Sequence, residues 1–310
     1  MSAHKASKDL VFVASGGRTG TTFLGERLEE VIAGCHSQHE PDVLGRSWKK
    51  NAERFKEFGV WHMLFGRILG FTGLRVVGQK FLSGDLDLNT AAKRMRHQRE
   101  SWHKSIEKPL IVESSGRNWM IAPVLQEAFP NSRIVGVIRD PRSWIESWIR
   151  HFPERHATGY DGWWPQGPLT PEQVGDTDWE GQWEALRQFG RLAWDWRIIT
   201  RELAKADAAT DNVHVFRFED LFDPDNDAEI GKVVRFIAFD GKYPVADLDG
   251  FTKSVRNASS GPRVVWQDWE PEKAALVDAM CGELMREYGY GKEPEWLAKV
   301  EEAKALAKAA

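Results

Sequence analysis

A short apolar run that leads directly into a glycine-rich loop and a helix start is the feature that most constrains the fold of this chain. The run Leu10–Ala14 is continuously apolar, which is typical of a strand buried on both faces of a parallel sheet. The loop Ser15–Thr22 contains three glycines, and a helical pattern begins at Thr21 and ends before Gly34. Strand, loop and helix in this order are the unit from which parallel α/β sheets are built.

Two further strand–helix units follow the same pattern. The apolar run Leu110–Val112 precedes a helical pattern around Asn118–Phe129, and Ile134–Ile138 precedes a helix that starts at Pro141. The remaining candidate strands are Arg75–Gly78 and Val213–Phe218. We therefore expect an α/β fold of three layers, in which a central parallel sheet of about five strands is flanked by helices.

The length of 310 residues is compatible with one domain, and we expect a single domain over 1–310. A long amphipathic stretch over 178–206 predicts a helix that packs one face on the body of the protein. The segments 152–177 and 240–267 show no clear period. Long irregular loops in compact domains are often functional, so we expect both segments to cover the active site.

Composition excludes several classes of protein. The 42 basic and 46 acidic residues give a net charge of −4, which offers no overall field to attract nucleic acid. The two cysteines, Cys35 and Cys281, have neither the spacing of a zinc site nor the density of a disulfide framework, so a reducing cytoplasm is expected. The run Leu10–Ala14 is too short for a signal peptide or a membrane span, and no membrane anchor is expected. The oligomeric state stays open.

The loop after the first strand predicts a binding site for a phosphate-like anion. Backbone N–H groups at a helix N-terminus favour an anion, glycines let the chain close around it, and Arg18 supplies a fixed positive charge. A Walker loop carries lysine immediately before its Ser/Thr, whereas Gly20 occupies that place here. The residues expected to contact the anion are Gly17, Arg18, Thr19, Gly20, Thr21 and Thr22.

A second anion site is predicted at the end of the strand Ile134–Ile138. Asp140 can cap the following helix and Pro141 suits its first turn, so both have structural explanations. Arg139 has none, and it lies at the carboxyl edge of the sheet, where open α/β sheets bind ligands. Ser147, on the helix that follows, can add a hydroxyl group to the same site.

With these motifs the chain resembles the sulfotransferase family. The segment Arg18–Thr22 is similar to the family's 5′-phosphosulfate loop, Arg139 with Ser147 is similar to its 3′-phosphate pair, and Phe218–Leu221 resembles its Tyr-Glu-Asp-Leu segment. The resemblance implies a P-loop-like fold and 3′-phosphoadenosine 5′-phosphosulfate (PAPS) as the sulfuryl donor, with no required metal. The acceptor is expected to be a small molecule or glycan that offers a hydroxyl or an amine, of unidentified kind.

The general base is predicted from the same resemblance. The arginine form of the loop resembles the carbohydrate- and tyrosyl-protein-type branches and their soluble bacterial relatives, in which a carboxylate soon after the first helix is the candidate base. Glu40 occupies that place, while Arg18 is expected to stabilise the leaving phosphate. His39 and His36 are alternatives, because imidazole titrates near neutrality without any perturbation.

Other residues are candidates for contacts with the acceptor or the nucleotide. Lys80 and Arg117 each follow a candidate strand and either reach the sulfuryl group or the acceptor, or are solvated loop cations. Trp163 and Trp164 lie in the segment 152–177, where their rings either close over an acceptor or clamp the loop. By resemblance, the cations Arg256 and Arg263 belong to a loop that covers the nucleotide.

Two other functions compete with sulfuryl transfer. An ATP- and magnesium-dependent P-loop phosphotransferase is disfavoured by Arg18 in place of the Walker lysine and by the pairing of Arg139 with Ser147. A non-catalytic nucleotide- or carbohydrate-binding module is suggested by the 15 tryptophans, but it leaves the candidate base unexplained. Turnover separates these functions.

Overall fold

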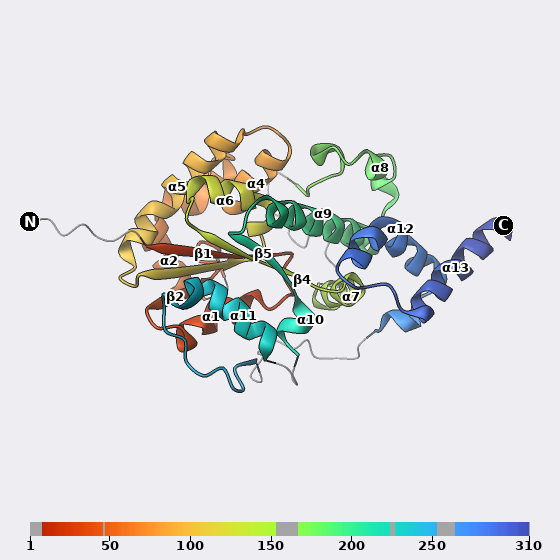
Figure 1. Ribbon diagram of the computed structural model, residues 1–310. Helices are drawn as coiled ribbons and strands as arrows, with labels where there is room; N and C mark the ends of the chain where they lie inside the picture. Colours follow the sequence, from red (N-terminus) through yellow and green to blue (C-terminus); the bar gives the residue numbers. More distant parts are fainter. Residues whose placement is uncertain (1–7, 46, 153–166, 224–226, 253–263, 310) are drawn as a thin grey trace, which may run out of the picture.

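The protein is built around a five-stranded parallel sheet between two layers of helices (Figure 1). The computed structural model describes residues 8–45, 47–152, 167–223, 227–252 and 264–309. The spatial order is β2-β3-β1-β4-β5, and the strands are Asp9–Ser15 (β1), Cys35–His39 (β2), Leu110–Ser115 (β3), Arg133–Ile138 (β4) and Val213–Arg217 (β5). The α/β fold predicted from the sequence, with its parallel sheet of about five strands, is confirmed.

The central strand β1 is apolar throughout because both of its faces are buried. Leu10, Phe12 and Ala14 pack into one hydrophobic core. Val11 and Val13 pack into a second core on the opposite face of the sheet. Since successive side chains of a strand point to opposite faces, two cores require an apolar residue at every position.

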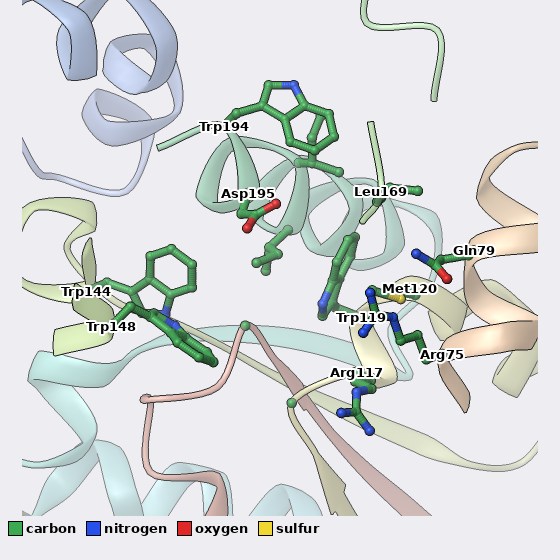
Figure 2. Close-up of a pocket in the computed structure, with 14 residues that line it drawn as sticks. Arg75, Gln79, Arg117, Trp119, Met120, Trp144, Trp148, Leu169, Trp194 and Asp195 are labelled. Carbon is green, nitrogen blue, oxygen red and sulfur yellow. The ribbon is translucent and has the colours of Figure 1, made fainter. Parts of the chain in front are cut away.

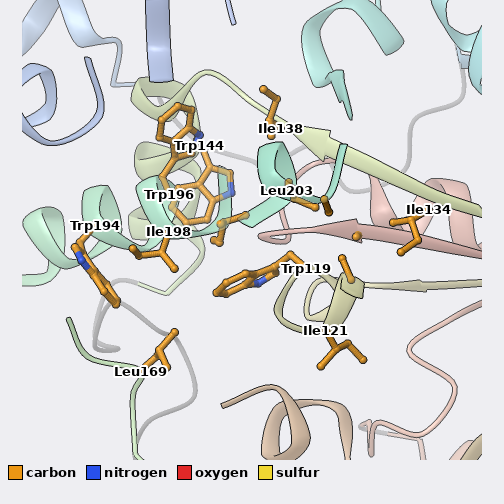
Figure 3. Close-up of a cluster of buried hydrophobic side chains, with 14 of the residues drawn as sticks. Trp119, Ile121, Ile134, Ile138, Trp144, Leu169, Trp194, Trp196, Ile198 and Leu203 are labelled. Carbon is orange, nitrogen blue, oxygen red and sulfur yellow. The ribbon is translucent and has the colours of Figure 1, made fainter. Parts of the chain in front are cut away.

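The larger core contains most of the buried tryptophans (Figure 3). Trp119, Trp144, Trp194 and Trp196 are all buried there. The helices that contribute to this core include α4 (Leu74–Leu82), α5 (Leu88–Ser105), α6 (Ala122–Ala128), α7 (Pro141–His151), α9 (Gln188–Ala209), α12 (Pro271–Glu287) and α13 (Pro294–Ala309). The 3-10 turn η2 (Asn118–Ile121) also belongs to it.

The smaller core lies between the sheet and two helices on its other face, α1 (Thr21–Val31) and α11 (Ala228–Ile237). The short helix α10 (Phe218–Leu221) follows β5 directly and adds Leu221 to this core. The remaining elements are α2 (Trp48–Val60), the π-helical turn η1 (Trp61–Phe65), α3 (Gly66–Ile68), η3 (Glu172–Val174), α8 (Thr177–Glu180), η4 (Trp183–Ala185), η5 (Phe239–Gly241) and η7 (Trp266–Asp268).

Two sequence predictions of secondary structure were wrong. The segment Arg75–Gly78 was expected to be a strand, but it lies within helix α4. Its β-branched residues favour a strand locally. In the folded chain, however, Val76 and Val77 are buried, and Gly78 lies so close to Met120 that an added Cβ would come within 2.6 Å of that side chain. Packing against η2 therefore overrides the local preference. The helix expected over 178–206 is divided into α8, η4 and α9.

One of the five strands, β2, was not predicted from the sequence. Its residues, Cys35–His39, are mostly polar, and only Cys35 and Ser37 are buried. β2 lies at the edge of the sheet and pairs with β3 alone, with His39 opposite Ser114. An edge strand needs less apolar surface than a central one, because only part of it packs against the core.

Candidate active site

The loop between β1 and α1 has a backbone shape that glycine makes possible. Gly17 and Gly20 have φ values of 73° and 78°, and Arg18 itself has a φ of 57°. The Ser15 hydroxyl accepts a hydrogen bond of 3.0 Å from the Gly17 amide. Gly116, which follows β3, approaches so closely that an added Cβ would lie 3.3 Å from the backbone of Gly17. The loop is therefore a compact turn at the carboxyl edge of the sheet.

Helix α1 begins at the end of this loop with an N-terminus that no side chain caps. The N-cap residue is Gly20, which has no side chain to accept from the first amides. Thr19 and Thr21 are buried beside it, and the Thr19 hydroxyl has no hydrogen-bond partner within the described chain. Uncapped amides and the positive end of the helix dipole favour an anion here, as predicted.

Arg18 and Arg139 meet at this loop. Arg18 Nε donates to the Ser147 hydroxyl at 3.2 Å, and one guanidinium N–H group of Arg139 donates to the Arg18 carbonyl at 3.1 Å. Arg139 Nε donates to the Ser143 hydroxyl at 2.9 Å. From the sequence, we predicted that Arg139 and Ser147 form one anion site and that Arg18 belongs to a separate one. The fold instead brings all three into one cluster, in which Ser147 contacts Arg18 and Arg139 contacts Ser143.

The charge of this cluster is larger than the two arginines suggest. Burial lowers the pKa of Arg18, and the positive charge of Arg150 lowers it further. Arg150 lies on α7, three positions after Ser147, which is the spacing that places two side chains on the same face of a helix. The sequence analysis missed this residue, although that spacing is visible in the sequence. Several cations brought together in this way favour an anionic ligand between them.

Arg139 is held by its surroundings. Its guanidinium group lies 4.6 Å from the centre of the Phe218 ring, and the Trp196 indole N–H donates to its carbonyl at 2.7 Å. Phe218 begins the segment that resembles the family motif. Next to it, Glu219 accepts hydrogen bonds from the Asp140 amide at 3.1 Å and from the Tyr290 hydroxyl at 2.6 Å. This segment thus fixes the turn that carries Arg139.

Glu40 and His39 lie at the end of β2. The Glu40 amide donates to the Ser114 carbonyl at 2.8 Å, and its φ of 46° turns the chain out of the sheet. His39 packs against α1 at Gly25, where an added Cβ would come within 2.8 Å. Burial lowers the pKa of His39, which therefore stays neutral at physiological pH. Both residues line a hollow of about 420 Å³ together with Arg54. His36 contacts the side chain of Gln38.

A buried ionic network anchors the chain just beyond Glu40. Asp42 Oδ2 accepts from His62 at 2.8 Å, from Arg67 at 3.0 Å and from Arg99 at 3.2 Å. Arg99 also donates to both carboxylate oxygens of Glu113. Burial acts to raise the pKa of Asp42, but Arg99 and Arg67 hold it well below its usual range. The sequence analysis missed this network because its members come from four separate segments.

An aromatic cavity of about 90 Å³ opens beside the loop (Figure 2). Gly16 and Gly116 form part of its wall, together with four indole rings, those of Trp119, Trp144, Trp148 and Trp194. The polar side chains at its wall are Arg75, Gln79, Arg117 and Asp195. Figure 2 shows Asp195 on α9, across the cavity from Arg75 and Arg117. The sequence analysis missed Asp195, since a single acidic residue in a long amphipathic helix carries no local signal.

The predicted acceptor residues separate in space. Arg117 lines the aromatic cavity, whereas Lys80 donates to the Gly70 carbonyl at 2.8 Å and is not among the residues that line it. Trp163, Trp164, Arg256 and Arg263 lie outside the described residues. Within the part of the chain that the structure describes, no cluster of three or more His, Cys, Asp or Glu residues could hold a metal ion. No helix among the described residues is both long and apolar enough to cross a membrane.

Sulfotransferases resemble this chain in sequence pattern and in fold. The model of the sulfotransferase family matches residues 10–240. No curated protein matches the chain. A sulfotransferase from Mycobacterium avium superimposes with a TM-score of 0.50 at 12% identity, covering 91% of this chain and 77% of its own. A sulfotransferase from Alicyclobacillus acidocaldarius has a TM-score of 0.42 at 14% identity, with 94% and 99% covered. At such identities the likeness in structure concerns the fold alone.

Proposed function

Because this chain belongs to the sulfotransferase family, we propose that it transfers a sulfuryl group from PAPS to a hydroxyl or an amine of an acceptor bound in the aromatic cavity. The observation that carries the proposal is the cluster of Arg18, Arg139 and Ser147 around one loop. PAPS carries a sulfated 5′-phosphate and a 3′-phosphate, so it needs cations at both ends. The uncapped start of α1 and the unpartnered Thr19 hydroxyl suit its 5′ end.

The residues of the loop would act on the bond that breaks. In the transfer, the acceptor oxygen or nitrogen forms a bond to sulfur while the bond between sulfur and the bridging oxygen of the 5′-phosphate breaks. Negative charge grows on that phosphate, and Arg18 together with the first amides of α1 would stabilise it. Arg139 would bind the 3′-phosphate. Sulfuryl transfer, like phosphoryl transfer, depends mainly on such positioning and charge stabilisation.

The acceptor must also lose a proton, and we propose that Glu40 accepts it. Glu40 directly follows β2, and its amide donates to the Ser114 carbonyl. It lines the hollow beside α1 and not the aromatic cavity, so the reacting group of the acceptor would have to extend from that cavity toward β2. A base held in place contributes roughly two to four orders of magnitude to the rate. His39 is the alternative base, and its neutral imidazole is able to accept a proton. The acceptor's apolar body would lie against the tryptophans of the cavity.

We further propose that the chain acts as one domain in a reducing cytoplasm. Helices α12 and α13, near the end of the chain, share the larger core with β1. Both cysteines, Cys35 and Cys281, are free and buried. Burial raises the pKa of Cys35 to about 12, so its thiol stays protonated and unreactive.

Binding of the desulfated product tests the donor site. Adenosine 3′,5′-bisphosphate should raise the melting temperature without magnesium, because a ligand that binds only the native state stabilises it. Arg18→Ala should reduce this shift. Arg133→Ala is the matched control, since Arg133 begins β4 at the opposite edge of the sheet from Arg139. A larger shift with ATP and magnesium than with the bisphosphate would instead indicate a phosphotransferase.

A further inference from the structure

One face of the segment between α2 and α4 exposes an unusual number of large apolar side chains. Their exposed fractions lie between 40% and 58%, although elsewhere most side chains of this type are in the two cores. We call this set the apolar ridge, and it consists of Val60, Trp61, Leu64, Phe65, Ile68, Leu69 and Phe71. Contiguous exposed apolar patches on a folded protein mark interaction sites.

The ridge is a fixed part of the fold. Its residues recur at helical spacing through η1 and α3, whereas His62 and Arg67 point to the opposite side and bind Asp42 in the buried network. The Thr72 hydroxyl donates to the His62 carbonyl at 2.9 Å, and Lys80 donates to the Gly70 carbonyl. Since both ends and the inner face of the segment are held, the apolar side chains stay exposed in the folded state.

Two cations lie against the ridge. Lys80 donates to the Gly70 carbonyl, between Leu69 and Phe71, and no acidic residue occurs from Phe58 to Gly84. The guanidinium group of Arg94, from α5, lies 5.7 Å from the centre of the Phe71 ring. An apolar face that contains tryptophan, phenylalanine and leucine and is bordered by cations is typical of segments that lie in the interface of an anionic bilayer.

We propose that the apolar ridge docks this protein on the surface of a lipid bilayer that contains anionic headgroups. A second copy of the chain fits the ridge less well. In a two-fold dimer the same surface meets itself, so each copy would bring Lys80 and Arg94 to the interface with no acidic residue of the ridge segment to pair with them. Anionic headgroups complement these cations, and the acyl region accepts the apolar side chains.

The segment that carries the ridge also contributes to the surroundings of the proposed acceptor site. Arg67, on the inner face of the ridge segment, lines a small hollow together with Arg75 and Arg117. The last two also line the aromatic cavity. Membrane docking itself does not depend on the proposed sulfuryl transfer, so the two ideas can be tested separately.

Flotation with lipid vesicles tests the proposal without donor or acceptor. We expect the protein to bind vesicles of phosphatidylcholine with about one third phosphatidylglycerol, to bind pure phosphatidylcholine less well, and to lose binding as salt rises. Phe65→Gln with Leu69→Gln should lower the partition coefficient at least about tenfold, because two large side chains no longer enter the apolar layer. The control is Leu297→Gln with Leu306→Gln, two leucines on α13 that are 45% and 51% exposed.

The outcomes separate the possible occupants. Loss of vesicle binding in the ridge variant alone, with unchanged melting temperature and bisphosphate binding, supports the proposal. Equal binding by the ridge variant and the control variant overturns it, and so does equal binding to both kinds of vesicle. A wild-type dimer that the ridge variant converts to a monomer, with no binding to vesicles, also overturns it and identifies a second copy as the occupant.

Discussion

Replacing Arg139 by alanine separates the two ends of the donor site. The change removes a charge-assisted hydrogen bond to the 3′-phosphate, which contributes about 1.5–3 kcal/mol and corresponds to roughly a tenfold to hundredfold change in affinity. It also removes the 3.1 Å bond from Arg139 to the Arg18 carbonyl. That bond holds the loop, and its loss should cost about 0.5–1.5 kcal/mol for any nucleotide that the loop binds.

Calorimetric titration with two ligands distinguishes these effects. Adenosine 3′,5′-bisphosphate should lose both contributions in Arg139→Ala, whereas adenosine 5′-phosphosulfate, which has no 3′-phosphate, should lose only the second. Ser147→Ala should weaken both ligands to a similar extent, because Ser147 contacts Arg18. Arg133→Ala should change neither affinity. Equal losses of both ligands in Arg139→Ala would refute the assignment of this residue to the 3′-phosphate and leave it the role of a loop brace.

Three further predictions concern the base, the acceptor and the stability. Glu40→Gln should leave bisphosphate binding intact and lower turnover about a hundredfold or more. Normal turnover in this variant, together with loss of turnover in His39→Asn, would identify the histidine as the base. Once a labelled-sulfate transfer screen has found an acceptor, Asp195→Asn should raise its KM without changing bisphosphate affinity, which would exclude a purely structural role. Burial lowers the pKa of His103 from 6.5 to about 3, so only the unfolded chain gains this proton between these values. The free energy of unfolding, measured by urea titration, should therefore fall by about 1 kcal/mol per pH unit as the pH drops below 6.5. His103→Leu should remove this part of the pH dependence. The same slope in the variant as in the wild type would contradict the prediction.

Much of the fold could be predicted from the sequence because the relevant signals are local. The run Leu10–Ala14 needs apolar residues at every position only if the strand is central, and β1 is the central strand. Gly17 and Gly20 mark positions of positive φ, and Asp140 caps α7 by accepting from the Arg142 amide. Each of these depends on backbone conformation within a few residues, which side-chain chemistry determines directly.

Interactions between distant segments could not be predicted in this way. The bond between Arg18 and Ser147 joins residues 129 positions apart, and it exists because β1 and β4 are neighbours in the sheet. Neither the pairing of the polar strand β2 with β3 nor the helical conformation of Arg75–Gly78 follows from local preference. Both depend on what each segment packs against.

The sequence by itself therefore determined the parallel α/β class, the glycine turn between β1 and α1 and the arginine after β4, because these follow from local backbone geometry and from residue type. Only the tertiary structure decided how the cations are shared, where Asp195 lies relative to the tryptophans, and that the apolar ridge is exposed. The physical reason is that burial and hydrogen-bond partners are set by the packing of whole elements, to which residues far apart in the chain contribute together.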